Sequence, residues 1–342
     1  MTASARRSRR GFSPTSRRAV APVALCTVAA LALALGACSS DDSPGSVDST
    51  GSGGSSAAPS EDFPRTVSVG DAQVRVKAQP ERIAVVSPDA ASLVTQLVPV
   101  DHIVMLTDQG KDNPDGPVIV PGSASVDPEQ ILSVNPDLVV VTVRHGQEKD
   151  AGAVLQDSGI PVAEFDAGAW SGIDDLLTNL DTLGQLTGAD SKAQELHEQI
   201  TRDRRRITGA LDKDVAKPRV LTLMARGGQR MIMPPTTMMN GLVREAGGTV
   251  IADETGSHGA APADPEVIAR LNPDVILVED YRGRGEQDFA DLLADPALAD
   301  VPAVQDHRVA YLPTATTGVS AGARIGEGLD AVGHAVGTLD AQ

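Results

Sequence analysis

The chain has 342 residues, enough for two domains of ordinary size or one large one. Hydrophobic residues make up 41% of it, which excludes global disorder, and aromatic residues only 2%, so any core or pocket must be mainly aliphatic. The formal net charge is −17, which makes nucleic-acid binding a poor candidate function because phosphate contacts require a basic face.

Residues 1–37 have the three parts of an export signal. A stretch rich in arginine comes first, an apolar run from Ala19 to Leu35 follows, and the small residues Gly36 and Ala37 close the segment. We therefore predict a signal peptide over residues 1–37, exported by the Sec or the twin-arginine route. A permanent transmembrane helix is the competing interpretation.

The segment Leu35-Gly36-Ala37-Cys38 resembles the lipobox of bacterial lipoproteins. The resemblance implies that Cys38 becomes a lipidated N-terminus, which anchors the protein to the outer side of the cell membrane without spanning it. Ordinary signal cleavage beside an incidental cysteine is the alternative. The rest of segment 38–62 is rich in Ser, Gly, Asp and Pro and predicts a flexible tether. The folded body that follows has no cysteine, which excludes a disulfide, a thiol nucleophile and a cysteine-ligated metal there.

An internal repeat divides the rest of the chain into two similar halves. Residues 127–141 read DPEQILSVNPDLVVV and residues 264–278 read DPEVIARLNPDVILV, at an offset of 137 residues. The same offset relates the apolar segment that begins at Arg82 to the one that begins at Arg219. Two separate segments that share one offset indicate a duplicated structural unit.

Each half is predicted to alternate strands and helices. Asp127-Pro128 and Asp264-Pro265 are the residue types preferred at a helix N-cap and at the first helical position. Continuous apolar segments typical of buried parallel strands cover residues 83–87, 138–143, 220–224 and 275–278. The predicted fold class is α/β, with two Rossmann-like lobes of parallel sheets at residues 63–180 and 215–342. One long linking helix is expected between them at residues 181–214.

The DPE-x-I-x-x-x-NPD unit of both halves, the linking helix and the lipobox resemble the substrate-binding lipoproteins of ABC importers. Within these, the chain is similar over residues 66 to about 335 to class III, which binds ferric siderophores, haem or vitamin B12. The resemblance implies a ligand cleft between the lobes, beyond the carboxyl ends of the strands. It also implies that one glutamate of each lobe, Glu129 and Glu266, docks onto the membrane permease. A carboxylate that only complements its helix dipole is the alternative explanation.

Candidate ligand-binding residues follow the predicted strand ends. Several are arginines, which hold carboxylate or catecholate oxygens in bidentate geometry and so predict an anionic ligand. Solvated arginines paired with neighbouring acids are the alternative. Trp170 lies near the lobe junction and is expected either to line the cleft or to cover the sheet edge. The candidates are Ser87, Arg144, His145, Trp170, Arg226, Arg230, Tyr281, Arg282 and Arg284. At the repeat offset Arg144 matches Tyr281 and His145 matches Arg282, so their loops are expected to face each other across the cleft.

The sequence therefore predicts a monomeric extracytoplasmic binding protein, not an enzyme, that captures a ferric siderophore or similar iron chelate and delivers it to an ABC permease. Haem is the rival ligand, with His145 and Tyr281 as iron ligands, and cobalamin is a further one. No resident cofactor or metal site is expected. The enzyme alternative is a hydrolase that uses an acidic residue with His258, although the chain has no P-loop and no G-x-G-x-x-G after a strand.

Overall fold

A computed structural model describes residues 63–107, 116–120, 126–144, 146–212, 214, 216–257 and 259–338. The predicted signal peptide, Cys38 and the tether lie outside the described residues, as do His145 and His258. None of the helices in the described ranges has both the length and the apolar character that a bilayer span requires.

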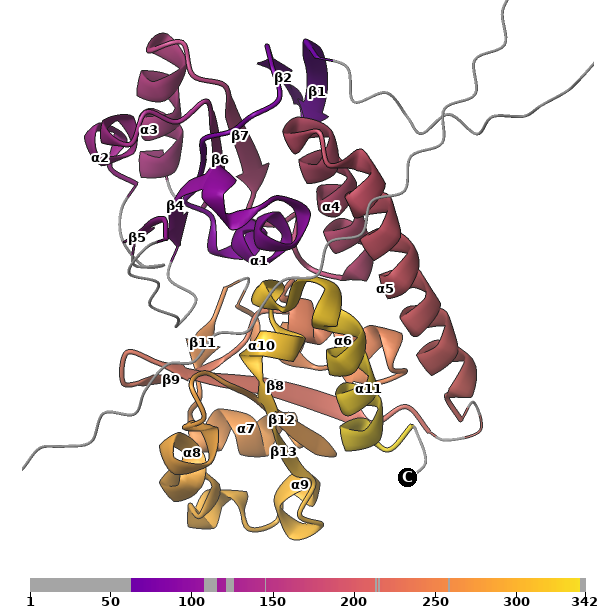
Figure 1. Cartoon of the computed structure of the whole chain (residues 1–342). Helices are drawn as coiled ribbons and strands as arrows, with labels where there is room; N and C mark the ends of the chain where they lie inside the picture. Colours follow the sequence, from indigo (N-terminus) through magenta and orange to yellow (C-terminus); the bar gives the residue numbers. More distant parts are fainter. Residues whose placement is uncertain are drawn as a thin grey trace, which may run out of the picture. The chain divides into compact units, whose positions relative to one another are not determined.

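The N-terminal lobe is built on a parallel sheet, as predicted (Figure 1). Its strands are β3 (Ile83–Val85), β4 (Ile103–Thr107), β5 (Val118–Val120), β6 (Leu138–Val143) and β7 (Val162–Asp166), in the order β5-β4-β3-β6-β7. The order reverses at β3, as in half of a Rossmann fold. The helices are α1 (Pro88–Leu97), η1 (Val100–His102), α2 (Pro128–Ser133) and α3 (Gly146–Asp157). A hairpin of β1 (Arg65–Val69) and β2 (Ala72–Val76) precedes the sheet.

The C-terminal lobe has the predicted parallel strands, but its sheet is mixed because two antiparallel strands extend it. The strands β8 (Arg219–Arg226), β10 (Thr249–Val250), β12 (Val275–Asp280) and β13 (Val309–Pro313) are parallel, whereas β9 (Gln229–Ile232) and β11 (Ala261–Pro262) add antiparallel pairs. Gly227 and Gly228 cause the difference: both have positive φ, 60° and 78°, and turn β8 back as a two-residue hairpin. A Gly-Gly pair between apolar runs is a recognisable hairpin signal.

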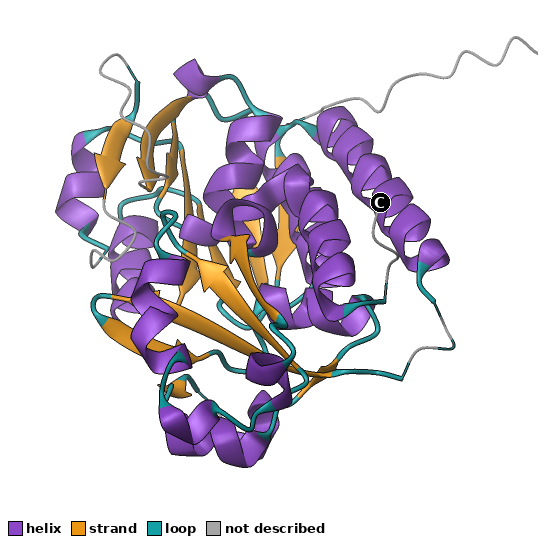
Figure 2. Ribbon diagram, turned by 90° about the horizontal axis from the view of Figure 1, so that it is seen from below, coloured by secondary structure: helices purple, strands orange, loops and turns teal. Residues whose placement is uncertain are grey.

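Helices flank the strands of this lobe on both sides (Figure 2). They are α6 (Met238–Glu245), η2 (Ala252–Thr255), α7 (Pro265–Leu271), α8 (Gly285–Leu293), η3 (Pro296–Leu298), α9 (Pro302–Gln305), α10 (Thr314–Thr317), η4 (Val319–Arg324) and α11 (Ile325–Val336). The helix starts predicted at the two DPE sequences are confirmed. The side chain of Asp127 accepts a hydrogen bond from the backbone N–H of Glu129 (3.0 Å), and that of Asp264 accepts one from Glu266 (2.8 Å).

The sequence repeat has a structural counterpart in the corner that joins each DPE helix to its strand. The Asp137 carboxylate accepts a hydrogen bond from the backbone N–H of Arg82 (2.9 Å), and Asp274 accepts one from Arg219 (2.8 Å). In return, the N–H of each aspartate donates to the carbonyl of the same arginine, at 2.9 Å in both lobes. Pairing then starts at the same offset, Ile83 with Leu138 and Val220 with Val275. The duplicated residues therefore fix the register of the central strands.

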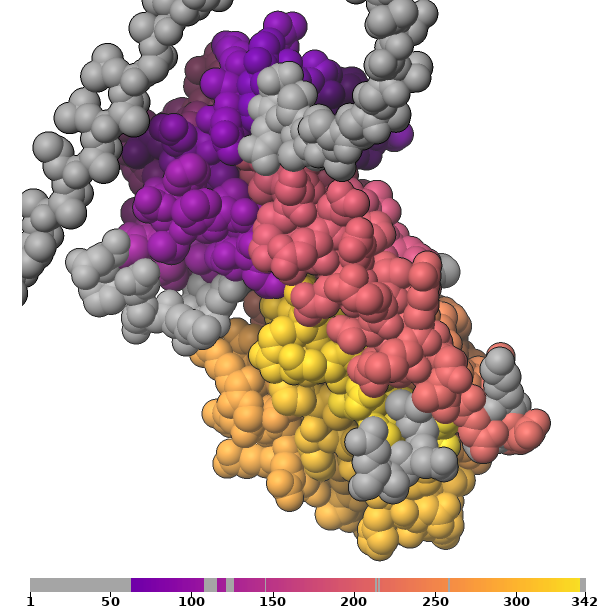
Figure 3. All heavy atoms as spheres, turned by 45° about the vertical axis from the view of Figure 1, so that its right-hand side comes forward, coloured from indigo at the N-terminus to yellow at the C-terminus, as the bar shows by residue number. Residues whose placement is uncertain are grey.

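Two helices connect the lobes. Helix α4 (Ile173–Thr187) ends at Gly188, and α5 (Asp190–Ala210) is the long linking helix. The expected linking segment 181–214 thus contains the end of α4 as well as α5. Helix α5 packs on α4 and on α11, and this red segment in Figure 3 lies beside both the indigo and the yellow parts of the chain.

The lobes also pack directly on each other. One hydrophobic cluster contains residues of the N-terminal sheet and α1, of α4 and α5, and of α6 and α11. At its edge α6 meets the start of α4 so closely that a Cβ on Gly241 would lie 2.3 Å from the Ser171 carbonyl oxygen. The Cα of Gly172 would lie 2.9 Å from the same Cβ. Since both of these neighbouring atoms belong to the backbone, this contact requires glycine.

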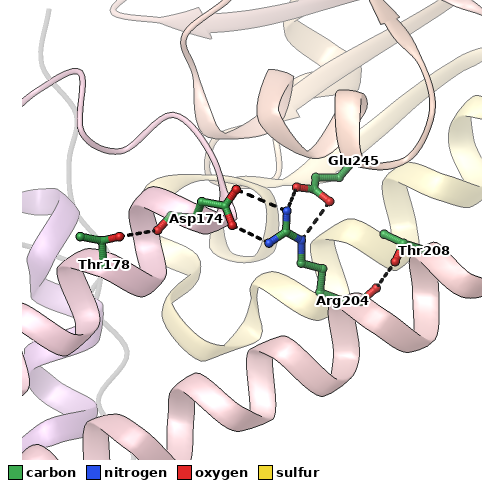
Figure 4. A network of polar contacts seen from close by, with 5 residues as sticks. All are labelled: Asp174, Thr178, Arg204, Thr208 and Glu245. Carbon is green, nitrogen blue, oxygen red and sulfur yellow. Dashed lines mark hydrogen bonds and ion pairs between the residues drawn. The ribbon is translucent and has the colours of Figure 1, made fainter.

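Arg204 of the linking helix bonds to both lobes (Figure 4). Its guanidinium donates to Asp174 at the start of α4 (Nη1 to Oδ1, 2.6 Å) and to Glu245 at the end of α6 (Nε to Oε2, 3.0 Å). The hydrogen bonds to Glu245 are the main reason why the pKa of Arg204 is raised above its ordinary value. The arginine therefore remains charged, and it ties α4, α5 and α6 together at the junction.

The Gly241 contact yields a stability prediction. Replacing Gly241 with alanine should lower the free energy of unfolding by about 1–3 kcal/mol, because backbone must move to admit the methyl group. Gly209→Ala in α5 is the matched control: nothing lies within 4 Å of the added Cβ, and helix propensity predicts stabilisation of about 0.5–1 kcal/mol. Urea unfolding of both variants measures the difference, and equal stabilities would contradict close packing at this point.

Candidate functional site

The carboxyl ends of both sheets lie toward the junction of the lobes. Helix α1, which begins directly after β3, packs against η4, which follows β13 and α10 (Figure 1). In open parallel sheets, ligands bind beyond these strand ends, at the point where the strand order reverses.

Ser87 is fully buried at the end of β3. Its hydroxyl accepts a hydrogen bond from the backbone N–H of Ala90 (3.0 Å), as the N-cap of α1, and bonds to the hydroxyl of Thr142 on β6 (2.5 Å). These contacts attach α1 to the sheet. In this structure Ser87 therefore caps α1 and joins it to β6, and its ligand-binding role stays a prediction.

Arg144 follows β6 and pairs with an acid that the sequence analysis does not single out. Its Nη2 lies 2.5 Å from both carboxylate oxygens of Asp89, in the first turn of α1. The Asp89 side chain is 0% exposed, whereas that of Arg144 is 44% exposed. Arg144 therefore compensates a buried charge with one side of its guanidinium while the remainder of the group reaches the surface.

Arg226, Tyr281 and Arg282 form a second group, the Tyr281 cluster, at the ends of β8 and β12. The guanidinium carbons of Arg226 and Arg282 lie 5.7 Å and 5.0 Å from the centre of the Tyr281 ring, within cation–π distance. Tyr281 is 38% exposed. The turn that carries it is held by Asp280, whose carboxylate accepts a hydrogen bond from the backbone N–H of Arg284 (2.7 Å).

Two further arginine candidates pair with acids on helix α8. Nη2 of Arg230 lies 2.5 Å from Asp291, and Nη2 of Arg284 lies 2.9 Å from Asp288. The alternative of arginines paired with neighbouring acids is therefore realised for both side chains in this structure.

The repeat offset relates the two edges. Asp89 corresponds to Arg226, and Arg144 corresponds to Tyr281. The two positions contact each other within each lobe, as Asp89 with Arg144 and as Arg226 with Tyr281. The chain runs as a helix at Asp89 and as a strand at Arg226, so the match is one of position and not of local structure. Each lobe thus has a contacting pair that includes an arginine at matching positions of the repeat, although the arginine follows β6 in one lobe and ends β8 in the other.

Trp170 is buried, with 2% of its surface exposed. Its ring packs on Phe165 at the end of β7, with 5.6 Å between ring centroids. In this arrangement the indole belongs to the core that the lobes share. Trp170 is therefore not an exposed residue at the strand ends, and its ligand-binding role stays a prediction.

Glu129 and Glu266 are exposed, each in the first turn of a DPE helix. Neither carboxylate makes a hydrogen bond or ion pair to another described residue. Their surroundings therefore leave both carboxylates available to a partner, and their role in docking stays a prediction.

One sequence pattern bears on the enzyme alternative. Residues 318–322 spell G-V-S-A-G, the spacing of a nucleophile elbow, which in hydrolases is a strand-to-helix turn. Here the segment follows helix α10, and the Ser320 hydroxyl donates to the Thr314 carbonyl (3.4 Å). No histidine in the described part of the chain hydrogen-bonds to Ser320, so the pattern does not form a catalytic pair there.

A polar cavity of about 750 Å³ lies away from the strand ends, between α4, α5 and α6. Arg204 lines it and pairs with Asp174 and Glu245, so its charges compensate each other within the protein. The strand ends remain the better candidate site because ligands of open parallel sheets bind there and because Arg226, Tyr281 and Arg282 are exposed there. Within the described ranges, no group of three or more His, Cys, Asp and Glu side chains is arranged to hold a metal ion.

Glu279, on the strand that leads to the Tyr281 cluster, is a buried carboxyl with 6% of its surface exposed. It faces Gly318, where an added Cβ would lie 2.8 Å from Oε1. Burial raises the pKa of Glu279 to about 7, because the charged form loses hydration. The carboxyl therefore titrates near neutral pH below the candidate site.

This pKa predicts a pH dependence of stability. The unfolded carboxyl titrates near 4.5, so the folded protein binds more protons between pH 4.5 and about 7, and its stability falls as pH rises through this range. The loss amounts to about 3 kcal/mol. Glu279→Gln should remove this part of the decline, whereas the exposed Glu266→Gln should keep it. Urea unfolding over a pH series tests both, and parallel curves for Glu279→Gln and wild type would contradict the assignment.

The sequence and the fold were compared with those of known proteins. The family model described as "Periplasmic binding protein" matches residues 84–316. No curated protein sequence matches the chain significantly.

Among solved structures, the apo form of the periplasmic haem-binding protein RhuT from Roseiflexus sp. RS-1 is 23% identical, with a TM-score of 0.63 over 75% of this chain and 97% of that one. A possible iron-binding periplasmic solute-binding protein from Staphylococcus epidermidis ATCC 12228 is 20% identical, with a TM-score of 0.61 over 76% of this chain and 100% of that one. The haem-binding protein BhuT, solved with two haems, is 22% identical, with a TM-score of 0.60 over 75% of this chain and 97% of that one.

At these identities the solved structures show a shared two-lobe fold, and the family match covers the strand ends and both DPE units. The chain belongs to the periplasmic binding protein family.

Proposed function

We propose that this protein captures an anionic iron chelate between the carboxyl ends of its two sheets and presents it to an ABC permease. The Tyr281 cluster is the observation that carries this proposal. Guanidinium groups bind carboxylate or catecholate oxygens in bidentate geometry, and a tyrosine oxygen is an established ligand of ferric iron in haem proteins. Tyr281 with Arg226 and Arg282 combines both kinds of group on an exposed edge.

Haem and ferric siderophores are the two ligand classes to distinguish. The exposed tyrosine supports haem, as do the haem-binding relatives RhuT and BhuT. The low aromatic content supports a ferric siderophore, because a haem pocket usually has flanking aromatic residues and this chain has seven in all. Arg144 and Arg226 suit either ligand, since both classes carry anionic oxygens.

Delivery requires that the permease distinguish the loaded protein from the empty one. A ligand that contacts both lobes favours the arrangement in which they are closest, and the permease recognises that arrangement. Because the lobes share a core and the Arg204 contacts, we propose that closure is small and that most of the site is formed before the ligand binds.

The ligand proposal predicts a selective effect of Tyr281. The chain has two tyrosines, so Tyr311 on β13 supplies the matched control. We expect residues 63–342 to bind haemin or a ferric tricatecholate, and Tyr281→Ala to weaken that binding by about tenfold or more, about 1.4 kcal/mol. Tyr311→Phe should bind as wild type does.

Absorbance and fluorescence titrations with haemin, a ferric tricatecholate, a ferric trihydroxamate and cobalamin measure these affinities. A Soret shift that Tyr281→Ala removes would identify haem as the ligand, and quenching by one ferric siderophore class would identify that class. Failure of all four ligands to bind would contradict the iron-chelate proposal and leave the family assignment unaffected.

The docking proposal predicts a loss of transport without a loss of binding. Glu129→Ala with Glu266→Ala should leave ligand affinity unchanged and abolish uptake, because both carboxylates lie on exposed helix starts and contacts of this kind set encounter and orientation. Glu195→Ala with Glu198→Ala, two exposed glutamates of α5, is the matched control and should retain uptake. Transport of the labelled chelate in cells measures the effect, and weaker ligand binding by the first double variant would count against docking.

A further inference from the structure

Asp89 is a buried charged group at the carboxyl edge of the N-terminal sheet. It is 0% exposed and lies in the first turn of α1, directly beyond β3. The positive end of a helix dipole favours a carboxylate at this position. A buried carboxylate nevertheless requires a close cationic or hydrogen-bonding partner, because it has lost its hydration.

Arg144 is that partner. Its Nη2 is 2.5 Å from Oδ1 and from Oδ2 of Asp89, so one nitrogen satisfies both oxygens. A guanidinium has five N–H donors, and this contact uses only those of Nη2. Nε and Nη1 of Arg144 make no hydrogen bond to another residue of the described ranges, and the side chain is 44% exposed. Three donors therefore remain for an external group.

The other arginine candidates that pair with acids are held differently. Asp291, the partner of Arg230, is 73% exposed, and Asp288, the partner of Arg284, is 28% exposed. Both of these acids are accessible to solvent, Asp291 largely and Asp288 in part, whereas Asp89 is buried where α1 packs on the sheet. Arg144 is therefore held by a rigid partner, which lowers the conformational entropy that a ligand must overcome to order it.

We propose that Asp89 is a positioning residue: it holds the Arg144 guanidinium so that an N–H group of Nε or of Nη1 is presented to an anionic group of the ligand. The inference rests on the proposed function, since it assumes an anionic ligand at the strand ends. It assigns the N-terminal lobe a preorganised cation opposite the Tyr281 cluster of the C-terminal lobe. Asp89 acts through Arg144 and does not itself contact the ligand.

If Asp89 instead neutralises Arg144, its removal changes the ligand affinity in the opposite direction. If the carboxylate only neutralised Arg144, its removal would free a positive charge and strengthen the binding of an anionic chelate. If it positions Arg144, removal lets the long side chain leave the productive geometry and weakens binding. The isosteric change Asp89→Asn separates the two roles, because it removes the charge and keeps the volume.

The experiment is a double-mutant cycle of Asp89→Asn and Arg144→Gln, with haemin and a ferric tricatecholate as probes. Each single variant should weaken binding of the probe that wild type prefers by about tenfold, and the double variant should bind no more weakly than Arg144→Gln alone. A purely structural role for Asp89 would weaken binding equally in both backgrounds. Asp291→Asn, which removes the exposed partner of Arg230, is the matched control and should bind as wild type does.

Thermal unfolding accompanies each titration, because Arg144→Gln leaves a buried carboxylate unpaired. Should that variant unfold, Asp89→Asn and the uncharged double variant still give the comparison: similar affinities support positioning. A stronger affinity in Asp89→Asn, or additive losses in the double variant, would overturn the inference while wild-type binding keeps the proposed function. If wild type binds neither probe, the positioning role fails, and the trihydroxamate titration decides whether the iron-chelate proposal fails with it.

Discussion

The packing of the two lobes on one shared hydrophobic core is the constraint on which the remaining geometry depends. Helix α6 lies so close to the start of α4 that only glycine fits at position 241. Arg204 adds hydrogen bonds to Asp174 of α4 and to Glu245 of α6. Well-packed interfaces of this kind resist continuous deformation. This packing is the basis for the proposal that the lobes close little and that the ligand site between their strand ends is largely formed in advance.

The strand ends of the two lobes position an arginine side chain in two different ways. The N-terminal lobe holds Arg144 with the buried Asp89, whereas the C-terminal lobe holds Arg226 over the ring of Tyr281. Both pairs occupy matching positions of the repeat, so one duplicated scaffold supports different chemistry on its two sides.

Predictions that rested on local chemistry were confirmed in detail. Asp127 and Asp264 cap their helices, and the central strands pair at the offset of the repeat, because caps and strand register depend on residues close in sequence or on a repeated corner. The antiparallel hairpin at Gly227 and Gly228 was missed, although its signal was present. The location of the candidate site at the strand ends stays a prediction, which rests on topology and on the family resemblance.

The sequence by itself determined the α/β class, the duplication, the capped helices and the family. Only the tertiary structure decided that Trp170 is core, that Arg230 and Arg284 pair with acids of α8, and that Asp89 lies buried against Arg144. The physical reason is distance along the chain. Helix caps and turns arise from neighbouring residues, whereas burial and ion pairing depend on which segments the fold brings together, and Asp89 and Arg144 are 55 residues apart.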